Sequence, residues 1–480
     1  MSGGAISAPA QAGAPVTVPL ADLYRIASEH EQAGRLDDAE RLIGLMRAQR
    51  PDQPDALHLA GIVAARRQRY AEAAGLMQQA LARGGTPGLI WRNICEVYRR
   101  LGRLDEAVAA GRRAVALAPN DAHALVNLAI IHYDRLELEA GIACCERAIA
   151  LAPDLPGAHF ELSEALLLGG DFARGWEEYE WRFQIAGAGK LMPKTDRPQW
   201  DGKPLREGTL LLIGDQGFGD VIQFSRYIPW AAARCPDLVL ACSKDMHMVV
   251  RQLPGVGRMF DRWEDAPPFT AFCPLSGLPR AHGTRPATVP AEIPYLRADP
   301  VRVALWASRL DALLPAGYRR VGIAWAGRPT HNNDHNRSMS LASCAKLAAV
   351  DGVALVSLQK GPAAAQVGRY VGAAPLLNLG PEIADWGDTM AILEALDLVV
   401  TVDTSVGHLA GAMGKPAWMM LPYAPDWRWL LGRSDTPWYP TMRLFRQPAP
   451  GRWDEVLEAV VAELDRGRKQ LRRGRRKHSA

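Results

Sequence analysis

The stretch Leu210-Leu-Leu-Ile-Gly-Asp-Gln-Gly-Phe-Gly-Asp220 decides the fold of the second half of the chain. Its apolar run predicts a buried strand, and the glycine-rich turn that follows predicts the start of a helix. Val402-Asp-Thr-Ser-Val-Gly-His408 has the same arrangement far downstream. Each turn would point free backbone N–H groups at an anionic ligand. We therefore expect a phosphate-bearing substrate in a cleft between two domains.

Strands and helices alternate on both sides of these turns. The predicted strands are 210–213, 238–242, 320–327, 354–358, 398–402 and 417–421. The predicted helices are about 220–233, 388–396 and 405–413. This alternation predicts two α/β domains, 208–315 and 316–465, with mostly parallel sheets and ligands at the carboxyl ends of the strands. The proline-rich passage 267–300 allows no element to be placed.

A period of 34 residues organises the first third of the chain. It aligns Pro51, Pro119 and Pro153, and it also places four residues in one column: Gly34, Gln68, Gly102 and Leu136. This period resembles the tetratricopeptide repeat and predicts an α-solenoid of about five helix pairs over residues 20–189. Such a solenoid has a concave face that receives a peptide or a helix. The aromatic run 176–183 predicts a capping helix that packs against the next domain.

Two asparagines occupy the same position of consecutive repeats. Asn93 and Asn127 are each the sixth residue of their unit, on the helix that lines the concave face in this repeat family. A carboxamide can bind a peptide backbone without reading its side chains. The pair resembles the asparagine ladder of the O-linked N-acetylglucosamine transferases, which makes both residues candidates for binding an acceptor peptide. The alternative is that two polar residues face water.

Composition limits the remaining possibilities. The net charge is +4, and the tail 466–480 carries eight lysines and arginines without an acid or an aromatic residue. We expect disordered ends at 1–19 and 466–480, a linker at 190–207, and no binding to nucleic acid. The seven cysteines show no C-x-x-C spacing, so free thiols are expected. No apolar run is long enough to span a membrane, and no signal peptide precedes residue 20, which predicts a cytoplasmic location.

Several motifs in order resemble family nine glycosyltransferases, the group of the lipopolysaccharide heptosyltransferases. The paired signatures are Gly219-Asp-Val-Ile-x-x-x-x-Tyr-Ile-Pro229 and Asp403-Thr-Ser-x-x-x-His-Leu-Ala410. A bacterial branch in which such a domain follows tetratricopeptide repeats is matched by Trp325-Ala-Gly-x-Pro, Asn336-Arg-Ser338, Ser357-Leu-Gln-Lys-Gly361 and Ala424-Pro-Asp-Trp-Arg-Trp429. The resemblance extends from residue 20 to about 448. It implies a GT-B pair of Rossmann-like domains and an inverting transfer from a nucleotide-diphosphate sugar.

The resemblance also suggests roles for individual residues. Asp220 is the candidate base, although it could instead cap its helix. Lys360 and Arg337 are cations where the diphosphate should lie, and Gln359 could bind the nucleobase or a phosphate. The remaining candidates for donor binding are Gly217, Gly219, Asp403, Thr404, Ser405 and His408. The sequence contains no Asp-x-Asp motif, so transfer without a metal or other cofactor is expected.

Three functions fit these residues. The first is a glycosyltransferase that modifies a protein acceptor, such as flagellin or another surface protein, recruited by the repeats. The second is a repeat-based interaction scaffold whose transferase-like domain is inactive. The third is a glycosyltransferase that acts on lipopolysaccharide or another glycan. Nucleic acid is not an expected partner, and no membrane span is expected.

Overall fold

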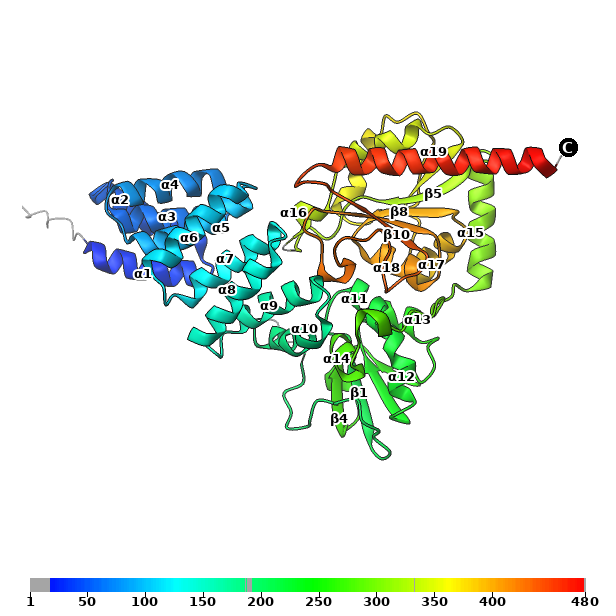
Figure 1. The fold of residues 1–480 in the computed structure, drawn as a ribbon, viewed down its shortest axis with the longest axis horizontal. Helices are drawn as coiled ribbons and strands as arrows, with labels where there is room; N and C mark the ends of the chain where they lie inside the picture. Colours follow the sequence, from blue (N-terminus) through cyan, green and yellow to red (C-terminus); the bar gives the residue numbers. More distant parts are fainter. Residues whose placement is uncertain (1–17, 186, 188–191, 332, 479–480) are drawn as a thin grey trace, which may run out of the picture. The chain divides into compact units, whose positions relative to one another are not determined.

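The computed structural model describes residues 18–185, 187, 192–331 and 333–478, and side chains only as far as residue 466. The predicted segment 1–19 therefore lies almost entirely outside the described residues. The chain forms two compact units, Met1–Ile131 and His132–Ala480 (Figure 1).

The first unit consists of paired helices. They are α1 (Leu20–Gln32), α2 (Leu36–Gln49), α3 (Pro54–Arg66), α4 (Tyr70–Ala82), α5 (Pro87–Arg100), α6 (Leu104–Leu117) and the first part of α7 (Ala122–Asp134). α1 packs against α2, α3 against α4 and α5 against α6, and small residues permit close crossings. A Cβ on Gly61 of α3, for example, would lie 2.7 Å from Cγ of Met77 on α4.

The turn inside a helix pair requires a left-handed residue. Gly34, Gln68 and Gly102 have φ angles of 76°, 60° and 71° in the first unit, and Leu136 has 58° in the second. These are the four residues that the 34-residue period aligns. The repeat therefore preserves a backbone conformation even where the residue is not glycine. That conformation costs a non-glycine residue about 1–2 kcal/mol.

The second unit begins with the end of the repeats. After α7 come α8 (Leu138–Leu151), α9 (Pro156–Leu168), α10 (Phe172–Tyr179) and the 3₁₀-helix η1 (Glu180–Gln184). The predicted contact of the aromatic run with the next domain is present, because Nε1 of Trp176 donates to the carbonyl of Thr284 at 3.0 Å. The run also reaches the second α/β domain, where the ring centroids of Trp176 and Tyr179 lie 5.1 and 5.9 Å from that of Trp427.

The first sheet of the second unit has four parallel strands in the order β3-β2-β1-β4. The strands are β1 (Thr209–Ile213), β2 (Asp237–Ala241), β3 (Arg258–Phe260) and β4 (Ala271–Pro274). Its helices are α11 (Phe218–Phe224), α12 (Ile228–Ala232), α13 (Lys244–Val250) and α14 (Leu278–His282). The predicted helix 220–233 is thus broken, because Pro229 has no N–H with which to continue the helical ladder.

The second sheet has six parallel strands in the order β10-β9-β8-β5-β6-β7. The strands are β5 (Arg319–Ala324), β6 (Val353–Ser357), β7 (Leu376–Asn378), β8 (Leu398–Val402), β9 (Ala417–Leu421) and β10 (Met442–Arg446). Every residue of β6 and β8 is buried, as expected for a parallel sheet covered on both faces. The associated helices are α15 (Pro300–Leu313), α16 (Asp334–Arg337), α17 (Trp386–Glu394), α18 (Ser405–Ala412) and α19 (Trp453–His478).

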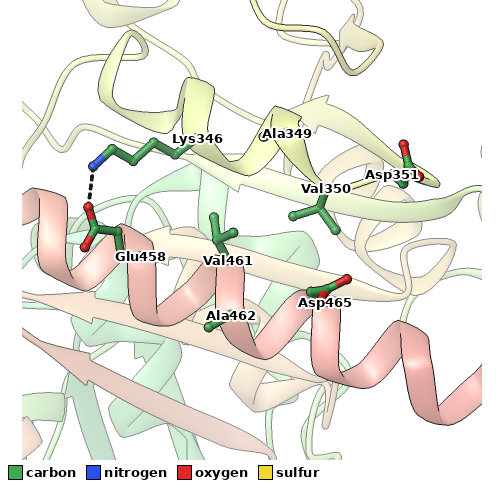
Figure 2. A pocket seen from close by; sticks show the side chains of 8 residues that line it. All are labelled: Lys346, Ala349, Val350, Asp351, Glu458, Val461, Ala462 and Asp465. Carbon is green, nitrogen blue, oxygen red and sulfur yellow. Dashed lines mark hydrogen bonds and ion pairs between the residues drawn. The ribbon is translucent and has the colours of Figure 1, made fainter.

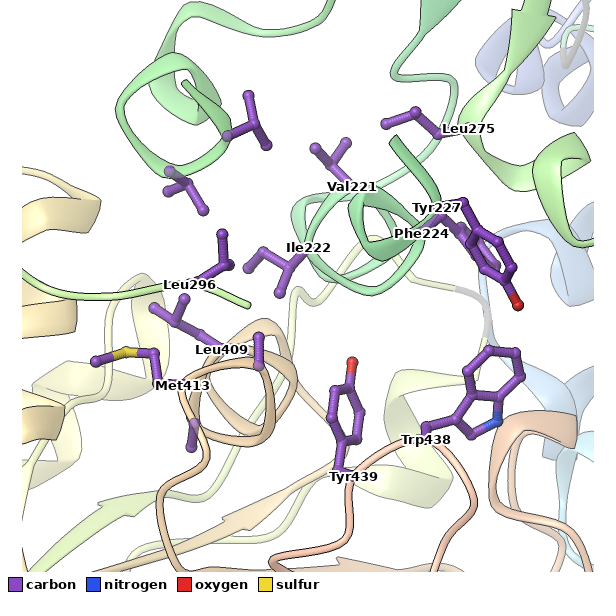
Figure 3. Close-up of a cluster of buried hydrophobic side chains, with 14 of the residues drawn as sticks. Val221, Ile222, Phe224, Tyr227, Leu275, Leu296, Leu409, Met413, Trp438 and Tyr439 are labelled. Atoms are coloured by element: carbon purple, nitrogen blue, oxygen red, sulfur yellow. The ribbon is translucent and has the colours of Figure 1, made fainter. Parts of the chain in front are cut away.

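Helices of the two sheets share one core. Val221, Ile222 and Phe224 of α11 lie beside Leu409 of α18 in a cluster of buried apolar side chains (Figure 3). A Cβ on Gly411 of α18 would lie 2.4 Å from the ring of Tyr439, so the helix lies very close to the loop before β10.

The structure differs from the predicted domain limits in three places. The helix α15, predicted in the first α/β domain, packs against α17 of the second sheet, where Arg302 pairs with Asp385 at 2.6 Å. The end of the predicted linker belongs to the first sheet, because Gln199 forms a bridge with Phe272 of β4. The tail predicted to be disordered from residue 466 continues α19 as far as His478, which fits its many helix-forming residues and lack of proline.

Candidate functional site

The two predicted turns meet where α11 approaches α18. A Cβ on Gly219 would lie 3.0 Å from Cδ2 of His408 and 3.6 Å from Cα of Ser405. A side chain at this position would force His408 to shift slightly, which gives Gly219 a steric role in addition to its predicted one. The structure therefore brings Gly219, Ser405 and His408 together from two different sheets.

The strand orders explain why the turns meet at this place. Counted within its own sheet, the second sheet has the order 3-2-1-4-5-6, the doubly wound arrangement, and the first sheet has the order 3-2-1-4. Ligands of such sheets bind at the carboxyl ends of strands, where the strand order reverses. In the first sheet this point lies between β1 and β4, and in the second sheet it lies between β5 and β8. The turn 214–219 follows β1, and Asp403 follows β8.

Asp220 is the third residue of α11 and makes two contacts. Its Oδ2 accepts a hydrogen bond from the N–H of Gly217 at 3.0 Å, and its Oδ1 accepts one from Nη2 of Arg428 at 2.5 Å. The first contact caps the helix, which is the alternative role weighed for this residue. An ionised carboxylate has about four acceptor positions, so Asp220 can accept further hydrogen bonds.

Arg428 connects most of the polar groups at this place. Its Nε donates to Oε1 of Gln223 at 2.7 Å, and its Nη1 donates to both carboxylate oxygens of Asp426 at 2.9 Å. The side chain is buried, and its guanidinium lies 4.3 Å from the ring centroid of Trp427. Burial alone would lower the pKa of Arg428, but Asp426 and Asp220 outweigh it and raise the pKa. We call Asp220, Asp403, His408, Asp426 and Arg428 the strand-end cluster.

Asp403 and His408 form the other side of this cluster. Asp403 Oδ2 accepts a hydrogen bond from Nε1 of Trp429 at 2.8 Å, and its Oδ1 lies 3.6 Å from Nε2 of His408. Burial would raise the pKa of Asp403, but His408, Trp429 and the charge of Arg337 lower it to about 2. His408 Nδ1 lies 2.9 Å from the hydroxyl of Tyr439, so the imidazole is held on both sides.

Thr404 is oriented toward the strand before it. Its Oγ1 lies 3.0 Å from Oγ1 of Thr401, and its side chain makes no capping hydrogen bond to α18. The N-terminus of α18 at Ser405 is therefore left to its backbone N–H groups, which is the arrangement predicted for phosphate binding.

Gln359 and Lys360 are engaged by backbone. Gln359 Oε1 accepts from the N–H groups of Trp325 and Ala326, and its Nε2 donates to the carbonyls of Ala326 and Lys360. Lys360 Nζ donates to the carbonyls of Gly380 and Ile383 at 2.9 and 2.8 Å. These contacts tie loops at the ends of β5, β6 and β7. A ligand contact by the Gln359 amide would have to replace one of them, whereas Lys360 keeps a third N–H for a ligand.

Arg337 lies closer to the cluster. Its Nε is 3.4 Å from Oδ1 of Asp334, and its Nη2 would be 2.5 Å from a Cβ on Gly327. Its charge contributes to the lowered pKa of Asp403. The candidates for donor binding in this region are Arg337, Gln359 and Lys360. Arg337 is the one whose charge acts on Asp403 of the strand-end cluster.

The last repeat supports the glycine-rich turn. Gln216 Nε2 donates to the Tyr179 hydroxyl at 3.0 Å, and Asp215 Oδ1 accepts from the N–H of Ser276 at 3.1 Å. Arg182 Nη2 donates to Oγ of the same serine at 2.5 Å. Sequence reasoning missed these supports, and it also assigned no role to Arg428 although that residue lies within the quoted 424–429 motif.

The predicted asparagines lie in the first unit. Both line a hollow of about 600 Å³ together with Tyr24, His58 and Arg92. Asn93 Nδ2 lies 2.8 Å from Nε2 of His58, and Asn127 Nδ2 donates to the carbonyl of Arg92 at 3.1 Å. Both carboxamides therefore line the hollow while one donor of each is held by a neighbouring repeat helix.

A second hollow lies between the 3₁₀-helix η7 (Ser343–Ala349) and α19. It measures about 700 Å³ and is crossed by the 3.0 Å contact between Lys346 Nζ and Glu458 Oε1 (Figure 2). It contains none of the predicted site residues.

No set of three or more metal-ligating side chains is grouped to hold an ion among the residues that the structure describes. Within the same residues, no helix is long and apolar enough to cross a membrane.

Comparison with known proteins identifies the repeats. The sequence model of the tetratricopeptide repeat family matches residues 24–89, 76–122 and 93–156. The N-terminal array consists of tetratricopeptide repeats. The predicted solenoid is thereby confirmed, and the C-terminal region has the predicted α/β character with parallel sheets.

One curated relative extends beyond the repeats. Protein FlbA from Caulobacter vibrioides (strain ATCC 19089 / CIP 103742 / CB 15) is 27% identical over 459 residues, which cover 89% of this chain and 75% of FlbA. Two solved structures match 35% of this chain: the thermophilic TPR protein TTC0263 of Thermus thermophilus and YrrB, a TPR protein with an unusual peptide-binding site. TTC0263 is 20% identical with 92% of its chain covered and a TM-score of 0.33, and YrrB is 17% identical with 87% covered and a TM-score of 0.29.

Proposed function

We propose that the chain is a glycosyltransferase that moves a sugar from a nucleotide-diphosphate sugar to a protein acceptor recruited by the repeats. The observation that carries the proposal is the meeting of two strand-end turns from two parallel sheets beside Asp220. The contact of Gly219 with His408 and Ser405 supports it. So does the resemblance of both turns to the signatures of family nine glycosyltransferases.

The proposed reaction assigns a role to each side of the cluster. The acceptor oxygen attacks the anomeric carbon, its proton passes to Asp220, and the bond from that carbon to the diphosphate breaks. The N–H groups at the start of α18 and the charge of Arg337 would stabilise the departing diphosphate. This transfer inverts the anomeric centre and requires neither a metal ion nor another cofactor.

The acceptor is proposed to bind through the first unit. Tetratricopeptide repeats are protein-interaction modules, and the hollow that contains Asn93 and Asn127 offers carboxamides to a peptide backbone. A surface protein such as flagellin is the acceptor that the family resemblance suggests.

The test combines an in vitro assay with mass analysis of cells. The purified chain is incubated with each common nucleotide sugar and an extract of Asp220→Asn cells, which supplies the unmodified acceptor, in the presence of chelator, and release of nucleoside diphosphate above that of the extract alone is measured for the native chain, Asp220→Asn and Asp245→Asn. Asp245 is an exposed residue near the start of α13, so its variant is the matched control. We expect turnover for the native chain and the control only, and a sugar-sized mass missing from one protein in Asp220→Asn cells.

Other results would favour the two alternatives. Unchanged protein masses together with an altered surface glycan would favour a glycan acceptor. The scaffold is supported by one specific observation, which is that Gln359 and Lys360 are engaged by backbone. A scaffold would release no nucleoside diphosphate from any donor and would bind its partner equally well after Asp403→Ala or Lys360→Ala.

A further inference from the structure

Arg226 is a buried cation, and no carboxylate pairs with it among the described residues. It belongs to the 3₁₀-helix η3 (Ser225–Tyr227), which follows α11 directly, and the residue is 6% exposed. The sequence motif that contains Asp220 includes Arg226 at one of its unspecified positions. A buried charge is costly unless neighbouring groups compensate it. The groups that surround this guanidinium therefore show what Arg226 holds in place.

Backbone carbonyls from three segments surround the guanidinium. Its Nε donates to the carbonyl of Gln223 at 2.9 Å, within α11. Its Nη1 donates to the carbonyls of Pro290 at 3.1 Å and Trp438 at 2.6 Å. Its Nη2 donates to the hydroxyl of Tyr295 at 3.2 Å. Arg226 thus connects the helices of the first sheet to the loop before β10 of the second sheet.

Three aromatic rings also face the guanidinium. The ring centroids of Tyr439, Tyr295 and Trp438 lie 4.7, 5.0 and 5.4 Å from its Cζ. Such cation–π contacts compensate part of the charge where no anion does. Tyr295 is itself fixed, because its hydroxyl donates to the carbonyl of Ile222 and its N–H donates to that of Ala412, both at 3.0 Å. The rings therefore hold the cation between the two sheets.

Tyr439 connects this arrangement to the strand-end cluster. Its hydroxyl lies 2.9 Å from Nδ1 of His408, whereas Nε2 of His408 lies 3.6 Å from Oδ1 of Asp403. Trp429 stacks on the imidazole with ring centroids 5.4 Å apart. A neutral imidazole has one donor nitrogen and one acceptor nitrogen. The carboxylate beside Nε2 favours the proton there, which leaves Nδ1 to accept from the phenol hydroxyl.

We propose that Arg226 is a positioning residue that holds the Tyr439 hydroxyl as the donor to Nδ1 of His408 and so keeps the imidazole proton on Nε2. The nearby cation makes the phenol a better proton donor, and it opposes a second positive charge on the imidazole. The tautomer of His408 is thus set by a residue of the first sheet. The consequence for turnover rests on the proposed function, but the tautomer does not.

The tautomer is measured by NMR of the full ligand-free chain, with ¹⁵N-labelled histidine, at about pH 8, where an ordinary imidazole is neutral. Correlations with the ring protons distinguish the protonated nitrogen from the other one, and His408→Gln identifies the signals of His408 among the eleven histidines. In the native chain we expect the proton on Nε2. A native chain with the proton on Nδ1 would overturn the proposal.

Arg226→Met should give a mixture of both His408 tautomers, because the loop that carries Tyr439 loses its hydrogen bond at Trp438. The matched control is Arg234→Met, which removes an arginine that lies 4.6 Å from the ring centroid of Trp230. The control should keep the native tautomer. An unchanged tautomer in Arg226→Met, or an equal change in both variants, would overturn the proposal.

Two milder variants keep the test valid if Arg226→Met does not fold. Arg226→Lys keeps the charge but has three donors in place of the fork of five, so it cannot make every contact and should also give a mixture. Tyr439→Phe keeps the ring and removes only the hydroxyl beside Nδ1, and it should change the tautomer with Arg226 in place. A native tautomer in either variant would overturn the proposal.

Turnover supplies a readout that a merely structural residue would not divide in this way. If nucleotide-sugar turnover is found, Arg226→Met should raise KM for the nucleotide sugar by about two- to tenfold, the effect of one hydrogen bond, and change kcat less, because His408 is a candidate for donor binding. A fall in kcat at unchanged KM would refute the positioning role. Absence of turnover in the native chain would reject the proposed function and leave the NMR result to decide the tautomer.

Discussion

Replacing Arg428 by methionine tests whether the strand-end cluster depends on one buried cation. The variant keeps most of the side-chain volume but removes the four hydrogen bonds to Gln223, Asp426 and Asp220. Breaking a buried ion pair by removing one partner costs about 3–5 kcal/mol, because the remaining charge is uncompensated. The carboxylates of Asp220 and Asp426 are 25% and 32% exposed, which places the expected loss near the lower limit, about 3 kcal/mol.

The loss is measured by thermal and urea unfolding of the full chain. Units larger than 250 residues change their melting temperature by about 2 °C for each kcal/mol, so we expect the transition of the second unit to fall by about 6 °C. The control is Arg433→Met, because Arg433 pairs with an exposed carboxylate, Asp435, and such pairs contribute below about 1 kcal/mol.

One further result sharpens the test. Arg428→Met combined with Asp426→Asn should recover part of the loss, because one of the uncompensated charges is removed. If Arg428→Met loses no more stability than Arg433→Met, the cluster does not depend on this cation and the reasoning is wrong.

Three other substitutions test separate features of the structure. Asp403→Asn should lower the free energy of unfolding by about 2 kcal/mol at neutral pH, because the lowered pKa of Asp403 contributes stability above pH 4 that is lost as the pH falls toward 2. The stability of the variant should therefore depend less on pH between 4 and 2 than that of the native chain. An equal pH dependence in both chains would contradict this prediction. Gly219→Ala should destabilise the second unit by about 1–3 kcal/mol through its contact with His408, whereas Gly257→Ala, where a Cβ meets open space, should leave its melting temperature nearly unchanged. Gln68→Gly should stabilise the first unit by up to about 1 kcal/mol, because glycine adopts the left-handed backbone of this position without strain. The control Gln79→Gly, inside the helix α4, should destabilise the unit by a similar amount. Urea unfolding in which both variants change the stability in the same direction would refute this prediction.

Local patterns predicted the elements with the strongest signals. The strands 398–402 and 417–421 have the predicted bounds, because each is a short apolar run between clear turn residues. The strands β3 and β7 have only three residues each, too few to show a period. β4 lies in the proline-rich passage, and its pairing with β1 is a tertiary contact that no local pattern records.

The candidate site was predictable to the same extent. The two turns could be identified because each is a local strand–turn–helix signal, and Asp220, Asp403 and His408 lie on them. Arg428 is separated from Asp220 by more than two hundred residues, so their hydrogen bond could not be read from spacing. Gln359 shows what a local pattern leaves out, because a polar residue after a strand suggests ligand binding, and the pattern does not record the backbone groups that its amide contacts.

The last repeat has a different physical role from the earlier ones. Repeats usually contact only their neighbours, so a terminal unit can be removed at the cost of one interface. Here Trp176 packs against Trp427 and donates to the carbonyl of Thr284, while Tyr179 holds the turn that carries Asp220. Removing the chain through the end of α10 would therefore expose an aromatic core and release the glycine-rich turn. The last repeat and the α/β sheets are thus not independent modules, because side chains of this repeat pack into their core and hold the turn before Asp220.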